Sequence, residues 1–227
     1  MTTTNRADTH RAETGAPSAE IRLPRSEREV QRFGAMRLLP IALAAEARQE
    51  SCQLLNGILA DTMILYAMYK KHHWLVAGPT FYQLHLLFDK HADEQLELVD
   101  LLAERVQTLG GVAVGDPRHA AELTSIERPP DGAEDVPSMI RRLLDAHETV
   151  ITRVRHAIGR TEESEDWGTN DLLMSDVLRR NELQVWFVAA HLVDMPLEAP
   201  RDQGTPEPGT RERVAVGPGH PRRSARA

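Results

Sequence analysis

The sequence predicts an all-α protein, a four-helix bundle between two tails. Apolar residues recur at helical spacing over long stretches, and the alternating pattern of β-strands is absent. The 227 residues suffice for one domain with tails. We therefore expect a disordered N-terminal tail over 1–38, the bundle over 39–198 and a disordered, basic C-terminal tail over 199–227.

The first two helices form the first half of the predicted bundle. The first is expected from about Pro40 to Trp74, with Leu54, Leu55, Ile58, Leu59, Leu65, Tyr66 and Tyr69 at helical spacings. Gly78-Pro79 interrupts the chain, and Pro79 and Thr80 suit the start of the second helix. That helix ends at Gly110-Gly111, after the apolar series Phe81, Leu84, Phe88, Val99, Leu102, Val106 and Leu109.

The second half begins after a long connection rich in Pro and Gly. We expect a short extra helix there, near Ala120, because the connection is unusually long for a simple bundle. The third helix is expected from about Pro137. An acidic loop, 162–166, then leads to a fourth helix that ends before Pro196, with Asn170 as its expected N-cap.

The charge of the predicted bundle differs in sign from that of the tails. The net charge is −7, but residues 49–198 carry thirteen Lys or Arg against twenty-five acids, whereas both tails are mildly basic. An acidic body suits a protein that handles cations, and basic tails suit contact with an anionic partner; solubility alone is the alternative. The single cysteine, Cys52, favours a reducing cytoplasm, and no apolar stretch is long enough to predict a membrane span.

Five residues around the second helix carry the candidate chemistry: His73, His85, Asp89, Asp100 and Glu104. Imidazole and carboxylate together suit iron. Each residue alone is explained as well by an ordinary polar helix surface. Taken together they are more informative, because at about 100° per residue the four from the second helix fall within one stripe about 100° wide.

The spacing of these residues predicts where a site would form. His85 and Asp100 are fifteen residues apart, or about 22 Å along a helix, whereas paired metals lie about 3.5–4 Å apart. One chain therefore cannot bring them into one dinuclear site. An antiparallel, two-fold-related copy would place His85 and Asp89 opposite Asp100 and Glu104, so the site is expected at a dimer interface.

Short motifs surround these residues. They are His72-His73-Trp74, Gly78-Pro79-Thr80-Phe81, Leu84-His85 with Asp89, Asp100 with Ala103-Glu104-Arg105, Ala47-Arg48-Gln49-Glu50-Ser51, Leu54-Leu55-Asn56 and Leu59-Ala60-Asp61-Thr62. Over about residues 42–195 the sequence resembles the Dps family of mini-ferritins. The resemblance implies a ferritin-like bundle, a hollow dodecamer and a ferroxidase centre between subunits.

The resemblance also implies a reaction and its ligands. Fe²⁺ is oxidised, with hydrogen peroxide as the preferred oxidant, and Fe³⁺ is stored as a mineral, which protects DNA from oxidative damage. His73, His85 and Asp89 would come from one chain and Asp100 and Glu104 from its partner. Trp74 is a candidate electron donor in such proteins; an aromatic anchor at a helix end is the alternative.

The other histidines and the methionines argue against two further kinds of metal site, a di-iron site inside the bundle and a haem site. No histidine has Glu three positions before it, so a di-iron site inside the bundle is not expected. His72 and His91 could bind extra metal, but solvated side chains are the preferred interpretation. The methionines show no pattern of axial ligands, so no haem is predicted.

The acidic loop and the C-terminal tail carry two further hypotheses. Glu165, Asp166 and Asp171, with Glu162 and Glu163, are expected to line a route for iron, because converging carboxylates concentrate cations; a solvated loop is the alternative. The candidate DNA contacts are Arg213, Arg222, Arg223 and Arg226.

Three functional classes remain open at this stage. The leading one is a cytoplasmic ferroxidase and iron store. The second is a nucleoid-associated protein that compacts DNA through its basic tails. The third is an ordinary helical bundle with no metal role.

Overall fold

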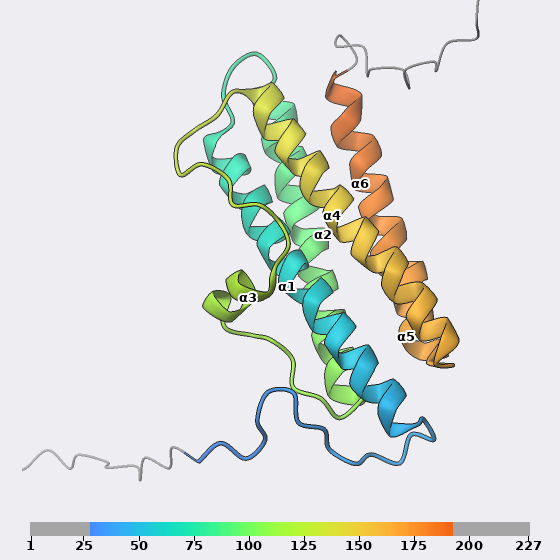
Figure 1. Cartoon of the computed structure of the whole chain (residues 1–227). Coiled ribbons are helices and arrows are strands. Elements are labelled where there is room, and N and C mark those ends of the chain that lie inside the picture. Colours follow the sequence, from blue (N-terminus) through green and yellow to red (C-terminus); the bar gives the residue numbers. More distant parts are fainter. Residues whose placement is uncertain (1–27, 193–227) are drawn as a thin grey trace, which may run out of the picture.

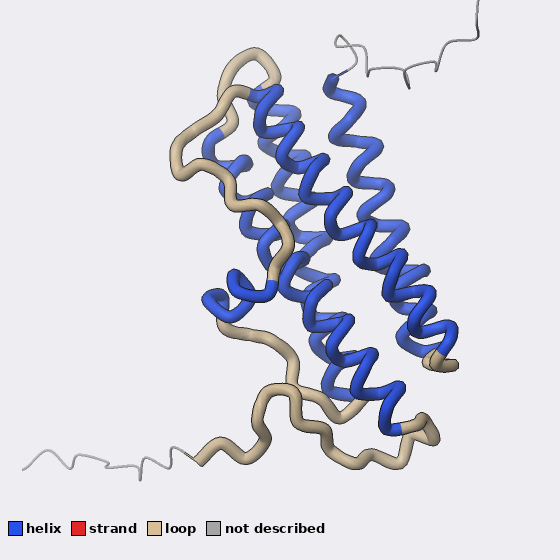
Figure 2. Tube along the Cα trace, viewed as in Figure 1, coloured by secondary structure: helices blue, strands red, loops and turns tan. Residues whose placement is uncertain are grey.

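The computed structural model describes residues 28–192, within which every regular element is helical (Figures 1 and 2). The helices are α1 (Ala45–Leu75), α2 (Phe81–Thr108), α3 (Pro117–Leu123), α4 (Val136–Glu163), α5 (Trp167–Leu172), η1 (Leu173–Leu178), α6 (Arg179–Ala189) and η2 (Ala190–Leu192). Elements α5 to η2 follow one another without a break and form the fourth long helix, in which η1 is a π-helical segment. The predicted all-α bundle, with a short helix in its long connection, is confirmed.

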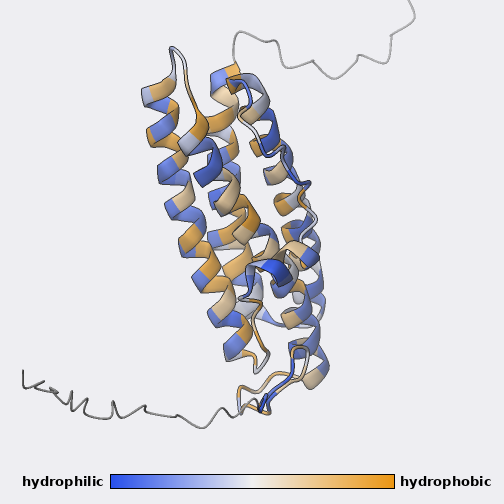
Figure 3. Ribbon diagram, turned by 90° about the vertical axis from the view of Figure 1, so that its left-hand side faces the viewer, coloured by the Kyte–Doolittle hydropathy of each residue, from blue (hydrophilic) through white to orange (hydrophobic). Residues whose placement is uncertain are grey.

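The four long helices share one apolar core. Helix α1 packs against α2 and α4, and α6 packs against α4, with the axes roughly aligned (Figure 1). Apolar residues recur along each helix between polar ones (Figure 3). Of the apolar residues predicted on α1, Leu55, Ile58, Leu59, Leu65 and Tyr69 are buried, as is Cys52. None of the described helices is both long and apolar enough to cross a membrane.

Aspartate residues begin the later helices. The side chain of Asp135 accepts a hydrogen bond from the Ser138 backbone N–H at the start of α4, and Asp166 accepts one from Thr169 at the start of α5. The prediction that Asn170 caps the fourth helix is wrong. Asn170 lies one turn inside that helix, where its side-chain amide donates to the carbonyl of Ile158 (2.8 Å).

Helix α1 begins later than predicted because Ala42 has φ of 54°, in the left-handed region that helical residues avoid. Residues 28–44 instead run irregularly along the bundle. The backbone N–H of Arg37 donates to the carbonyl of Gly110 (2.7 Å), and Arg48 donates to the carbonyl of Arg37 (2.9 Å). Gly110 is required at this crossing, because it has φ of +91° and a Cβ atom there would lie 2.4 Å from the Arg37 carbonyl oxygen.

The prediction of a disordered tail is therefore wrong for residues 28–38. Hydrogen bonds hold this segment against the bundle, and such bonds cannot be recognised from a hydrophobic pattern in the sequence. The rest of that predicted tail, residues 1–27, lies outside the described residues. So does the predicted C-terminal tail, including Arg213, Arg222, Arg223 and Arg226.

Candidate metal centre

Two of the predicted ligands, His73 and His85, contact each other where α1 ends and α2 begins. Their rings are stacked, with centroids 3.8 Å apart and planes 19° from parallel. Nδ1 of His73 lies 2.7 Å from the backbone carbonyl oxygen of His85, and Nδ1 of His85 lies 2.9 Å from that of His73. The short turn 76–80, in which Gly78 has φ of +101°, brings the two helix ends together.

These reciprocal hydrogen bonds fix how each imidazole is protonated. A carbonyl oxygen can only accept, so Nδ1 carries the proton in both rings. When the rings are neutral, each Nε2 therefore keeps its lone pair. Histidine ligands of metals are commonly oriented in this way, by an N–H donated from the other ring nitrogen to a backbone carbonyl. Both rings are thus prepared to bind a cation through Nε2.

Asp89 lies beside this pair on the next turn of α2. Its Oδ1 is 3.8 Å from Nε2 of His73 and accepts a hydrogen bond of 2.5 Å from Nζ of Lys70. That hydrogen bond lowers the pKa of Asp89 below its usual value, so the carboxylate is ionised at neutral pH. A metal cation that binds Oδ1 of Asp89 would therefore compete with the ammonium of Lys70.

Asp100 and Glu104 do not join the other three residues. They lie farther along the same helix, about 22 Å from His85 by the helical rise. Both side chains are exposed, and neither forms a hydrogen bond or ion pair within residues 28–192. Over the same range, no group of three or more His, Cys, Asp or Glu side chains is close enough to hold a metal ion.

Large apolar side chains are exposed on the same face of α2. Tyr82, Leu86 and Leu96 are 67%, 49% and 49% exposed, and by the helical period of about 100° per residue they fall within the stripe that carries the predicted ligands. Trp74, beside His73, is 69% exposed. Such exposed apolar surface indicates an interaction site. The face that carries the predicted ligands thus has the composition of an interface.

The preferred interpretation of His72 and His91 as solvated residues is wrong. Both are buried, at 0% and 1% exposure, because they lie on the inward faces of α1 and α2. His91 belongs to a cluster of polar side chains in the bundle interior that was not predicted from the sequence. One sequence signal could have found the cluster: Tyr69, His91 and His147 occupy core-facing positions of their helices, where polar residues require partners.

The acidic residues of the predicted iron route differ in their environments. Asp166 is 2% exposed and forms an ion pair with Arg105 (2.6 Å) while it caps α5, so its prediction as a lining residue is wrong. Its carboxylate accepts hydrogen bonds from Arg105 of α2 and from Thr169 of α5, which hold it between these helices. Glu165 and Asp171 are exposed, with Asp171 accepting a hydrogen bond from Ser175. For these two residues the route stays a prediction.

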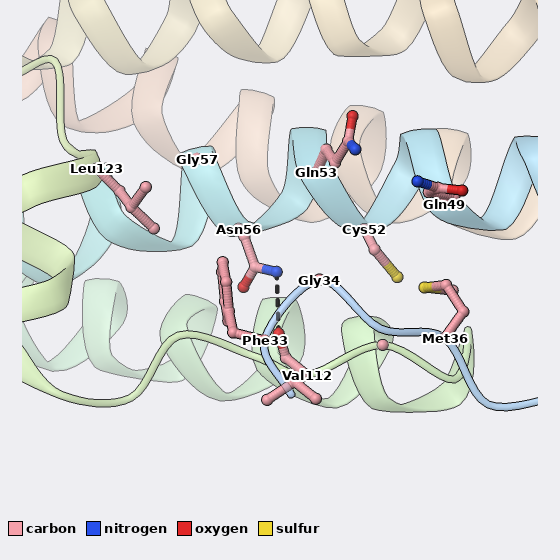
Figure 4. Close-up of a pocket in the computed structure, with 11 residues that line it drawn as sticks. Phe33, Gly34, Met36, Gln49, Cys52, Gln53, Asn56, Gly57, Val112 and Leu123 are labelled. Carbon is pink, nitrogen blue, oxygen red and sulfur yellow. Dashed lines mark hydrogen bonds between the residues drawn. The ribbon is translucent and has the colours of Figure 1, made fainter. Parts of the chain in front are cut away.

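An apolar cavity of about 230 Å³ lies near the beginning of α1 (Figure 4). The side chains of Cys52 and Met36 point into it, and Asn56 donates to the carbonyl of Val112 across it (3.0 Å). Burial raises the pKa of the Cys52 thiol. None of the predicted metal ligands lines this cavity, so it is separate from the candidate centre.

Comparisons with known proteins agree on one family. A profile of the ferritin-like domain matches residues 52–197. The structure of DpsC from Streptomyces coelicolor is 65% identical, covers 75% of this chain and 99% of that chain, and gives a TM-score of 0.73. A nutrient stress-induced DNA-binding protein from Synechococcus is 32% identical over 67% of this chain and 87% of its own length.

A third relative is described in terms of its metal chemistry. It is a Dps protein from Vibrio cholerae, described as a member of a broad superfamily of ferritin-like diiron-carboxylate proteins. It is 28% identical, with a TM-score of 0.65, and the match covers 70% of this chain and 98% of that chain.

Proposed function

Because this chain belongs to the Dps family of ferritin-like proteins, we propose that it oxidises Fe(II) at centres shared between two subunits and stores the ferric product inside a closed shell. The observation that carries the proposal is the histidine pair of His73 and His85. Both Nε2 atoms are left free by reciprocal Nδ1 hydrogen bonds, beside the carboxylate of Asp89.

The second half of the centre comes from the other end of α2. Asp100 and Glu104 are exposed carboxylates without partners among residues 28–192, on the face that carries the exposed apolar side chains. A two-fold axis across this face would bring Asp100 of the partner subunit opposite Asp89, and it would create two equivalent centres per dimer. A dodecameric shell would contain six such dimers, with Fe²⁺ as substrate and Fe³⁺ mineral as cargo.

The donor set suits the oxidation of iron. Neutral imidazoles bind Fe(II), and carboxylates stabilise the higher charge of Fe(III), so the set favours the oxidised product. With hydrogen peroxide as oxidant, two Fe(II), one peroxide and two protons give two Fe(III) and two waters. Lys70 competes with iron for Oδ1 of Asp89, since its ammonium lies 2.5 Å from that oxygen.

A complementation experiment tests the shared site. His85→Ala and Asp100→Ala/Glu104→Ala proteins are each expected to oxidise Fe(II) slowly, because each lacks one half of every centre. After the two proteins are dissociated, mixed in equal amounts and reassembled, about one quarter of the centres are intact by random pairing across the two-fold axis. Ferric absorbance after Fe(II) and peroxide addition should therefore recover to about one quarter of the wild-type rate.

The matched control mixes His85→Ala with Asp89→Ala. Both substitutions affect the same half of the centre, so no pairing restores it and no recovery is expected. Equal rates in the two mixtures would contradict a centre shared between subunits. Native mass measurement of the mixtures establishes that each has reassembled to the same size.

A second candidate role, DNA binding, is supported by one relative and by charge. The Synechococcus relative is described as a DNA-binding protein. Here Arg213, Arg222, Arg223 and Arg226 follow the last acidic residue of the chain. One tail offers few phosphate contacts, but several tails of one shell acting together would increase avidity. DNA retardation by full-length shells and by shells truncated at Arg213, across a salt series, tests this role; equal retardation contradicts it.

A further inference from the structure

Hydrogen bonds connect buried polar side chains across the bundle interior, from α1 and α2 to α4 and α6. The Tyr69 hydroxyl lies 2.6 Å from Nε2 of His147, and Nδ1 of His147 lies 2.9 Å from Oδ1 of Asn181. Nδ1 of His91 lies 3.2 Å from the same hydroxyl. All four side chains are between 0% and 1% exposed. The phenol of Tyr69 is therefore held between two imidazoles, away from water.

The direction of each proton follows from the neighbours. Nδ2 of Asn181 donates to the carbonyl of Val177 (2.7 Å), so its Oδ1 faces His147 and accepts from Nδ1. Nε2 of His147 then has only a lone pair, and the Tyr69 hydroxyl must donate to it. Burial lowers the pKa of His147 to about 3 and raises that of Tyr69, so both groups are neutral at pH 7.

Tyr69 lies close to the candidate metal centre. It precedes His73 by four residues of α1, about 6 Å along the helix axis. Its ring centroid is 6.1 Å from that of Phe88, the neighbour of Asp89 on α2. A hydrogen-bonded phenol thus lies on the helical turn next to the one that carries His73, and it packs beside Phe88, the neighbour of Asp89.

We propose that Tyr69 is a one-electron donor to the oxidant that forms when peroxide meets a single Fe(II), with His147 as the acceptor of its proton. The proposal rests on the proposed ferroxidase function. Removal of an electron from a phenol makes its hydroxyl proton far more acidic than an imidazolium. A base already hydrogen-bonded to the phenol therefore lets the proton leave as the electron does.

The electrons and protons balance in three steps. One Fe(II), one hydrogen peroxide and one proton give Fe(III), water and a hydroxyl radical. Tyr69 then gives one electron to the hydroxyl radical, which becomes hydroxide and takes a solvent proton to form water, while the phenol proton moves to Nε2 of His147. A second Fe(II) later returns an electron to the tyrosyl radical as His147 returns the proton. In sum, two Fe(II) and one peroxide give two Fe(III) and two waters.

The buried location of the phenol would keep the radical away from other molecules. A hydroxyl radical that leaves the centre attacks any organic molecule nearby, whereas a tyrosyl radical at Tyr69 is fully buried and waits for the next Fe(II). A purely structural hydrogen-bond network would have the same geometry but would form no radical. Electron paramagnetic resonance separates the two roles.

The experiment uses the assembled protein, loaded anaerobically with one Fe(II) per centre, mixed with hydrogen peroxide and frozen within the first turnover. The chain has three tyrosines, so a Tyr66→Phe/Tyr82→Phe variant keeps Tyr69 as its only one without altering the buried network. We expect a tyrosyl signal in the wild type and in this variant, and its loss in Tyr69→Phe. We also expect more hydroxyl radical to be captured by a spin trap in Tyr69→Phe.

Ferric absorbance recorded on the same samples separates the possible failures. Iron oxidation without a tyrosyl signal in the wild type, or with an equal signal in Tyr69→Phe, would overturn the role of Tyr69 and leave the ferroxidase proposal standing. Loss of the signal in the Tyr66→Phe/Tyr82→Phe variant would overturn the assignment to Tyr69 without requiring Tyr69→Phe to fold. Absence of iron oxidation in the wild type would overturn both proposals.

Discussion

Two pairs of histidines lie within a few helical turns of each other and differ in the hydrogen bonds of their Nδ1 and Nε2 atoms. His73 and His85, where α1 ends and α2 begins, donate from Nδ1 to backbone carbonyls, and neither Nε2 forms a hydrogen bond within residues 28–192, although Asp89 lies 3.8 Å from that of His73. His91 and His147, inside the bundle, contact the Tyr69 hydroxyl, and His147 has partners on both nitrogens. The outer pair, His73 and His85, leaves Nε2 available for the proposed iron, and the inner pair, His91 and His147, contacts a phenol.

Hydrogen bonding, more than residue type, thus distinguishes the candidate metal site from the core cluster. Carboxylates follow the same division. Asp166 is buried against Arg105 and Thr169, whereas Asp100 and Glu104 are exposed and have no partner in the part of the chain that the structure describes. Polar groups whose bonds are all satisfied stabilise the fold, and those left open within one chain are available to a ligand or a second subunit.

The largest expected effect comes from the outer pair. His73→Ala should lower the initial rate of Fe(II) oxidation by about a hundredfold, or about 2.7 kcal/mol, because it removes a ligand with a free Nε2. The variant should also lose some stability, because the His73 side chain is only 13% exposed and stacks on His85, so the rate is measured below the unfolding midpoint of the variant. Stopped-flow ferric absorbance and circular dichroism measure the two quantities. Glu97→Ala, an exposed residue of α2, is the control; an equal rate loss there would contradict the site.

The inner pair should make stability depend on pH. Burial lowers the folded-state pKa of His147 to about 3, below the unfolded value of about 6.5, so this group's stabilisation is complete above pH 6.5. It is lost as pH falls from 6.5 toward 3, because only the unfolded chain takes up the proton. Between pH 6.5 and 5 the loss should be about 2 kcal/mol.

Denaturant unfolding of the wild type and of His147→Gln at these two pH values tests this expectation. Glutamine does not titrate, so the variant should lose about 2 kcal/mol less than the wild type across the interval. Titrating groups outside this cluster affect both proteins alike. Parallel pH dependences would show that His147 is not held neutral by burial.

Among the carboxylates, Asp166→Ala should affect stability and leave iron uptake unchanged. The variant loses the cap of α5, at a cost of about 1 kcal/mol, and leaves Arg105 without its partner. Uptake of iron by intact shells at low Fe(II) should match the wild type. Asp171→Ala is the matched variant at an exposed acid of the same helix. Slower iron uptake in Asp166→Ala than in Asp171→Ala would contradict this expectation and support Asp166 as a residue of the iron route.

The smallest expected effect concerns Lys70. Lys70→Met removes the ammonium that holds Asp89, so Fe(II) should bind up to about fivefold more tightly, as an ion pair worth at most about 1 kcal/mol allows. Anaerobic titration with Fe(II) measures the affinity. Lys71→Met, at the neighbouring residue, is the control. Weaker binding in Lys70→Met would mean that Lys70 supports the centre instead of competing with iron.

The sequence by itself determined the class of fold and the one-sided pattern of the predicted ligands. Helical periodicity and the break at Gly78-Pro79 depend on local backbone preferences, so the long helices were predicted to within a few residues. The stripe of His85, Asp89, Asp100 and Glu104 follows from helix geometry alone, and so does the conclusion that one chain cannot complete the site.

Only the tertiary structure decided how polar residues are paired. Sequence spacing does not reveal whether a histidine such as His91 or an aspartate such as Asp166 faces another helix, because that depends on how distant segments pack. Both were assigned to solvent or to a surface route, and both are buried with partners from other elements. The physical reason is that burial makes a hydrogen-bond partner necessary, and that partner is distant in sequence: Tyr69 for His91, and Arg105 for Asp166.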